Sequence, residues 1–116
     1  MTKQRSKRRQ PETPHIYTLL IHPTAYHELK QLPGHVRQRA RRAIDGLATD
    51  PKPSGSSRLE QDVSPREVRR LRLDKWRVLY ALDEKWKEVA IIAIRQRPPY
   101  QYQDLGELLR GLEEGA

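Results

Sequence analysis

Residues 67–94 read EVRRLRLDKWRVLYALDEKWKEVAIIAI, and the fold prediction depends on this stretch. The segments 67–73, 76–82 and 86–94 are rich in apolar, β-branched and aromatic residues, which is typical of β-strands. Only two or three residues separate neighbouring segments, so each neighbouring pair is predicted to form a hairpin. Two consecutive hairpins predict an antiparallel meander of three strands.

The first turn, Asp74-Lys75, determines which side chains share a face of this meander. A two-residue turn pairs Leu73 with Trp76, Arg72 with Arg77, and Arg70 with Leu79. Directly paired residues lie on the same face, and neighbours along a strand alternate between faces. The three arginines are therefore predicted to project from one side. The other side is predicted to form the core, with Leu71, Leu73, Trp76, Val78 and Tyr80.

The second turn, Asp83-Glu84-Lys85, extends this prediction to the last strand. A three-residue turn pairs Leu82 with Trp86 and Arg77 with Ile91. Strand alternation then places Arg95 on the arginine side, with Arg97 continuing the line. Bulky cations directly opposite each other repel unless an anion compensates them, so this face is predicted to bind phosphate.

The rest of the chain predicts helices around this meander. A β-branched apolar run predicts a strand at 16–22. Helical spacing of apolar residues predicts helices at 24–32, with Thr24 as its cap, at 36–49, and at 104–112. A Pro-, Gly- and Ser-rich loop is predicted at 50–57. The predicted fold class is α+β, a helical hairpin packed on an antiparallel β-sheet in the order β-α-α-β-β-β, with a short C-terminal helix.

Length and composition limit the class of protein. The 116 residues fit one domain, predicted at 15–112, between a basic disordered tail at 1–14 and a flexible C-terminus at 113–116. There is no cysteine, and the four histidines show no metal-ligand spacing, so neither a cofactor nor a metal is predicted. No apolar run is long enough to span a bilayer, and no secretory signal begins the chain, so a cytoplasmic protein is expected.

The charge is strongly basic, with 23 Lys and Arg against 15 Asp and Glu and a net charge of +8. Such a surplus favours a polyanionic partner. The basic tail fits two descriptions, a solubilising segment or a non-specific phosphate-binding arm.

The segment from Arg70 to Tyr80, RLRLDKWRVLY, resembles the pattern R-x-R-x-x-x-[YW]-R-[VL]-[LI]-Y of the RelE/ParE toxin superfamily. The upstream helix pair, the break LATDPKP at 47–53 and the arginines after the last strand agree with this resemblance, which covers about 17–105. It implies a small α+β domain with two helices against an antiparallel sheet.

The resemblance also implies site residues. Arg77 matches the arginine that contacts the scissile phosphate, and Arg70 and Arg72 match the basic pair on the preceding strand. Either Arg95 or Arg97 matches the basic residue after the last strand, and either Tyr100 or Tyr102 matches a tyrosine that stacks on a base. The expected catalytic residues are Arg70, Arg72, Arg77, Arg95, Arg97 and Tyr102, with Lys75 and Tyr100 as further RNA contacts.

By resemblance, the chain is expected to be the toxin of a type II toxin–antitoxin system, a ribosome-dependent mRNA endonuclease that inhibits translation. Its expected partners are a cognate acidic antitoxin, the ribosome and mRNA. The alternatives are a ParE-like inhibitor of DNA gyrase without nuclease activity, or a non-catalytic RNA- or ribosome-binding module. Arginine stands at positions 70 and 72, where RelE-type sites usually have lysine, and this favours the alternatives. The last helix either completes the fold or forms a surface that an antitoxin displaces.

Overall fold

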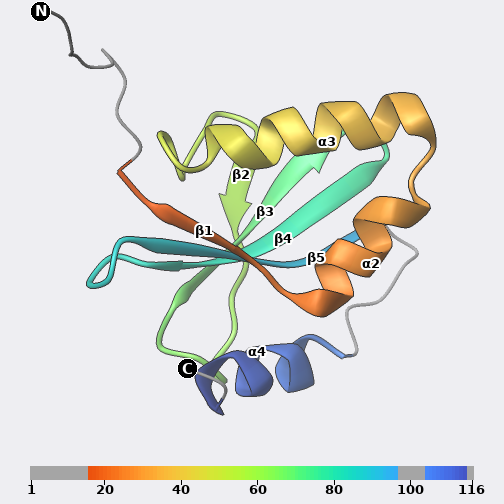
Figure 1. Ribbon diagram of the computed structural model, residues 1–116. Helices are drawn as coiled ribbons and strands as arrows, with labels where there is room; N and C mark the ends of the chain where they lie inside the picture. Colours follow the sequence, from red (N-terminus) through yellow and green to blue (C-terminus); the bar gives the residue numbers. More distant parts are fainter. Residues whose placement is uncertain (1–15, 97–103, 115–116) are drawn as a thin grey trace, which may run out of the picture.

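The computed structural model describes residues 16–96 and 104–114. It contains a five-stranded sheet with helices on both faces (Figure 1). The strands lie side by side in the order β1-β5-β4-β3-β2. Their bounds are β1 (Thr18–Ile21), β2 (Ser56–Arg58), β3 (Glu67–Leu73), β4 (Trp76–Asp83) and β5 (Glu88–Gln96). The helices are α2 (Pro23–Gln31), α3 (Gly34–Gly46) and α4 (Leu105–Glu114). The predicted α+β class is confirmed, and the predicted basic tail lies outside the described residues.

The hairpin of β3 and β4 has the predicted register. Leu73 pairs with Trp76, Arg72 with Arg77, and Arg70 with Leu79. Asp74 has a positive φ of 55° in the two-residue turn. Short hairpin turns need this left-handed conformation, and aspartate tolerates it better than most residues. The sequence Asp74-Lys75 therefore supports the register on which the position of the arginines depends.

The turn between β4 and β5 is longer than predicted. It has four residues, Glu84 to Lys87, and Asp83 pairs with Glu88. The Asp83 carboxylate accepts the N–H groups of Lys85 and Trp86 at 3.0 and 3.1 Å. These bonds hold the two residues in the turn and out of the ladder. The predicted pair Leu82–Trp86 is therefore wrong, and Trp86 is 71% exposed.

An irregularity in β5 changes the register again. Tyr80 pairs with Ile91 and Leu79 with Ala93, so Ile92 is an extra residue in the ladder. Arg77 consequently pairs with Arg95, and the predicted pair Arg77–Ile91 is wrong. Ile91 now pairs with Tyr80 and lies in the core beneath α2 and α3, whereas Arg95 pairs directly with Arg77. The predicted face for Arg95 is therefore correct, because directly paired residues share a face.

The sheet has two strand pairings that the sequence did not indicate. β1 runs parallel to β5, with Thr18 opposite Glu88, so the sheet is mixed rather than wholly antiparallel. A parallel pair needs a long crossover, which the helices and the other strands provide here. β2 begins within the predicted 50–57 loop and pairs with the edge of β3. Its three polar residues show no strand pattern, because the neighbouring strand supplies the pairing.

Helices α2 and α3 cover one face of the sheet, and α4 covers the opposite face (Figure 1). The first core includes Tyr80, which is fully buried as predicted, and Trp76 packs against it. The second core lies under α4, around the fully buried Leu109. The predicted cap of α2 is wrong: His22 is the N-cap, and its Nδ1 accepts the N–H of Thr24 at 3.1 Å. None of the described helices combines the length and hydropathy needed to cross a membrane.

Candidate phosphate-binding site

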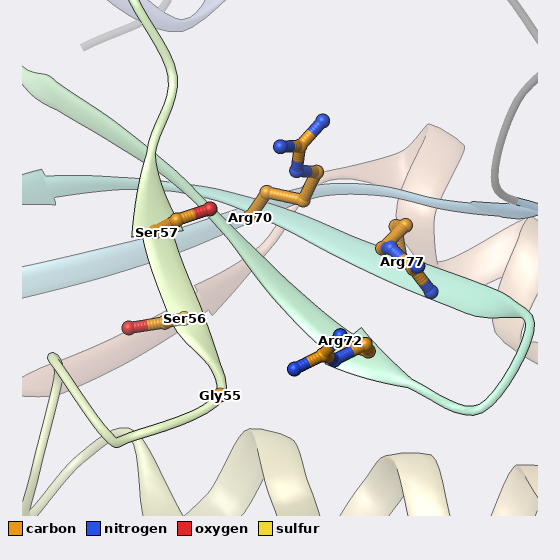
Figure 2. Close-up of a pocket in the computed structure, with 6 residues that line it drawn as sticks. All are labelled: Gly55, Ser56, Ser57, Arg70, Arg72 and Arg77. Atoms are coloured by element: carbon orange, nitrogen blue, oxygen red, sulfur yellow. The ribbon is translucent and has the colours of Figure 1, made fainter.

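Three arginines from two neighbouring strands meet in one open pocket of about 350 Å³ (Figure 2). Arg70 and Arg72 extend from β3, and Arg77 extends from β4. The other wall is the edge of the sheet, where Gly55, Ser56 and Ser57 contribute to the lining. The turn length and strand alternation predict that the three arginines share a face, and the structure places them together.

The apolar residues between the arginines determine which way they project. Leu71 and Val78 are 7% and 0% exposed, and both lie in the core beneath α2 and α3. Because neighbours along a strand alternate, Arg70, Arg72 and Arg77 must project from the opposite face. Burial of the intervening side chains thus keeps the arginines on this face. Fully burying one large apolar side chain stabilises the fold by about 1.5–3 kcal/mol.

Two of the three guanidinium groups, those of Arg70 and Arg72, have no compensating anion among the described residues. Arg77 donates to the backbone carbonyls of Asp74 and Trp76 at 2.7 and 2.8 Å, which orients its guanidinium beside the turn. Arg72 and Arg77 stand directly opposite each other, a repulsive pairing that a bound phosphate would relieve.

Arg95 lies on the same face, but its guanidinium forms a structural clamp. Its Nε donates to Glu28 on α2 at 2.7 Å, and its two terminal nitrogens donate to Asp104 at 2.6 and 2.7 Å. The Arg95 side chain is 10% exposed, and it is not part of the pocket lining. The arginine therefore joins α2, β5 and the start of α4.

Two other arginines from the same basic region, Arg66 and Arg69, are engaged in ion pairs elsewhere. Arg66, 9% exposed, forms ion pairs with Glu88 at 3.0 Å and Glu113 at 3.1 Å, and so holds the end of α4. Arg69 lies on the α3 side, where it contacts Glu67 and Ser56 at 2.6 and 2.9 Å. Lys75 is exposed in the neighbouring turn. The burial of Arg66 and Arg69 depends on partners brought together by the fold, which a count of basic residues cannot identify.

Three predicted site residues, Arg97, Tyr100 and Tyr102, lie outside the described residues. Ser57, which also lines the pocket, was not among the predicted site residues, because the strand that carries it was not predicted. The described lining of the pocket includes no carboxylate or imidazole. The described residues also contain no group of three His, Asp or Glu that could hold a metal ion. The pocket is therefore suited to binding an anion through guanidinium and hydroxyl groups.

The clamp is expected to make stability depend on pH. The hydrogen bond from Arg95 lowers the pKa of the Asp104 carboxyl below its usual value. A depressed pKa means that this stabilisation is complete above the ordinary value of about 3.9 and is lost as the pH falls through the lower folded value. Chemical unfolding of the wild type and Asp104→Asn at several pH values measures this. The difference in free energy of unfolding between them should shrink below about pH 4, and a constant difference would contradict the assignment.

Comparison with known proteins identifies the family. The sequence model of the ParE toxin of type II toxin–antitoxin system, parDE, matches residues 19–98. The chain belongs to this family. The match includes both strands that carry the arginine pocket, and the predicted resemblance to the RelE/ParE superfamily is confirmed.

Solved structures show the same fold as this toxin. The archaeal RelE–RelB complex from Pyrococcus horikoshii OT3 has a chain with 26% identity and a TM-score of 0.65, covering 73% of this chain and 99% of that one. The RelBE2 toxin–antitoxin complex from Mycobacterium tuberculosis has a chain with 23% identity and a TM-score of 0.59, covering 70% of this chain and 98% of that one. The isolated E. coli RelE toxin has 16% identity and a TM-score of 0.59, covering 83% of this chain and 98% of that one. No curated relative matches the sequence.

Proposed function

We propose that this toxin is a ribosome-dependent mRNA endonuclease that inhibits translation. The observation that carries the proposal is the pocket in which Arg70, Arg72 and Arg77 converge without a carboxylate in the described lining. A planar guanidinium binds phosphate oxygens in a bidentate manner, and three of them together favour a phosphodiester. The similarity to RelE structures supports this choice of substrate.

The chemistry of the pocket fits charge stabilisation better than proton transfer. RNA cleavage by 2′-hydroxyl attack needs a base, an acid and stabilisation of the charge that develops at phosphorus. Arginine stabilises the charge, but its pKa of about 12 or above keeps it protonated, which makes it a poor base. We therefore expect Arg77 to hold the scissile phosphate while the ribosome holds the RNA in an in-line geometry.

An acidic antitoxin is the proposed inhibitory partner. The arginine pocket and the net charge of +8 complement an acidic chain. The structures from P. horikoshii and M. tuberculosis that resemble this toxin are both complexes with an antitoxin. We infer that the antitoxin neutralises the pocket arginines and so competes with RNA for them.

The second candidate is inhibition of DNA gyrase without nuclease activity. One observation favours it: the family whose sequence model matches is named for the ParE toxin. In this case the arginine pocket would contact the enzyme target or its DNA. The two candidates differ in whether RNA chains are cut.

Controlled expression in bacteria distinguishes the two candidates. Primer extension on cellular mRNA shortly after induction should reveal new 5′ ends within translated frames, and these ends should disappear when ribosomes are kept off the message. Arg77→Ala should remove these ends. Arg58→Ala, the matched control, should retain them, because Arg58 is exposed and lies outside the pocket. Growth arrest with intact mRNA and gyrase-dependent DNA breaks would overturn the nuclease proposal and support the second candidate.

A further inference from the structure

Ser57 occupies a special place in the wall of the pocket. It pairs directly with Arg70 across the β2–β3 ladder, so the two side chains share a face. Figure 2 shows its hydroxyl directed toward the arginine side, whereas the Ser56 hydroxyl points away. Ser57 therefore places an uncharged hydroxyl beside three guanidinium groups.

The strand that carries Ser57 is anchored on both sides of it. The Arg72 N–H donates to the Gly55 carbonyl at 3.0 Å, and the Leu59 N–H donates to the Val68 carbonyl at 2.8 Å. The Tyr80 hydroxyl donates to the Pro51 carbonyl at 2.6 Å, which ties the preceding loop to β4. The position of Ser57 is thus set by the sheet and its core.

The two neighbouring serines have different roles. The Ser56 Oγ donates to the Pro53 carbonyl at 2.8 Å and accepts from the Arg69 guanidinium at 2.9 Å. The Ser57 Oγ has no hydrogen-bond partner among the described residues. Ser56 is therefore part of the structure of the β2 edge, and the hydroxyl of Ser57 remains available to a ligand.

We propose that Ser57 hydrogen-bonds to the 2′-hydroxyl of a bound nucleotide and makes the pocket select RNA over DNA. This inference rests on the proposed function, because it assumes that the pocket arginines hold an RNA phosphate. Phosphates are the same in RNA and DNA, so the arginines cannot tell the two apart. The 2′-hydroxyl both donates and accepts, and a serine hydroxyl does the same, whereas a guanidinium only donates.

The spacing of the pocket suits one nucleotide. Arg72 and Arg77 form one cross-strand row, and Ser57 and Arg70 form the next row on the same face. Two residues along a strand separate the rows, a distance of about 6.7 Å. A phosphate in the first row leaves its adjoining ribose beside the second row. Ser57 is then placed to contact the sugar, and Arg70 is placed to contact the next phosphate.

The test compares two labelled pentanucleotides of one sequence, one RNA and one DNA, by fluorescence anisotropy at about 50 mM salt, where phosphate contacts are strong. Wild-type protein should bind the RNA about three- to tenfold more tightly, the range for one neutral hydrogen bond. Ser57→Ala should weaken RNA binding until it equals DNA binding. Ser57→Thr, which keeps the hydroxyl, should retain the preference. Arg72→Ala should weaken both equally.

Each contrary result identifies what has failed. An equal loss for RNA and DNA in Ser57→Ala, or a preference unchanged in that variant, would overturn the role of Ser57 while the phosphate site stands. Wild-type binding without an RNA preference would do the same. RNA binding that is insensitive to both Arg72→Ala and Arg77→Ala would overturn the proposed pocket itself, and so would no binding up to about 1 mM. Ser57 is exposed, so these substitutions leave the core intact.

Discussion

Replacing Arg77 with alanine is expected to lower the rate of RNA cleavage on the ribosome about 100- to 1000-fold, the usual loss when one charge-stabilising donor is removed. The physical reason is the position of its guanidinium, opposite Arg72 in a pocket without a carboxylate in its described lining. The measurement is a single-turnover cleavage assay on ribosomes that carry a defined message. Lysine at this position keeps the charge but loses the planar fork, so Arg77→Lys should recover only part of the rate.

Two further variants separate catalysis from folding. Arg77 also donates to two backbone carbonyls of the turn, so the free energy of unfolding of Arg77→Ala must be measured in parallel. Arg72 forms no ion pair with a described residue, and Arg72→Ala therefore removes pocket charge without breaking a salt bridge. It should also lower the rate while leaving stability within about 0.5 kcal/mol. A fully toxic, folded Arg77→Ala protein would refute the role of the arginine face for any target.

Replacing Arg95 with alanine is expected to lower the free energy of unfolding by about 2–3 kcal/mol, or the melting temperature by roughly 10 °C. The change leaves the carboxylates of Glu28 and Asp104 without their shared cation. The effect lies at or below the lower end of the range for broken buried pairs, because Asp104 is 41% exposed and partly solvated. Urea unfolding followed by circular dichroism measures it.

Arg110 provides the matched control for this clamp. It lies on α4, is exposed, and forms no ion pair with a described residue. Arg110→Ala should therefore change stability by less than about 0.5 kcal/mol. The outcome for Arg95 also separates two roles. A variant that is as stable as wild type but inactive in cleavage would contradict the clamp and favour the catalytic role that the family resemblance implies.

The case of Arg95 shows how sequence and structure contribute differently to the site. Strand alternation places Arg95 on the arginine face, and the structure agrees. Alternation does not say where a long side chain ends. Its guanidinium reaches Glu28, 67 residues away in the chain, and Asp104, and both partners are brought close by the packing of α2 and α4. Competition between carboxylates and solvent for a cation is settled only when the elements are assembled.

Ser57 shows the opposite limitation. No periodic pattern marks residues 56–58 as a strand, since the segment is short, polar and preceded by a Pro- and Gly-containing loop. Residues 56–58 form a strand because they pair with the edge of β3, where unpaired backbone groups gain hydrogen bonds from an extended neighbour. Local β-propensity therefore did not predict the strand that forms one wall of the pocket.

The sequence by itself determined the central hairpin and its cationic face. The two-residue turn at Asp74-Lys75 and the alternation of apolar and basic residues are local properties, and they suffice to bring Arg70, Arg72 and Arg77 to one side. Only the tertiary structure decided the parallel pairing of β1 with β5, and which arginines stay in the pocket rather than in buried ion pairs. These features depend on contacts between residues far apart in the chain, whose free energies appear only when helices and sheet pack together.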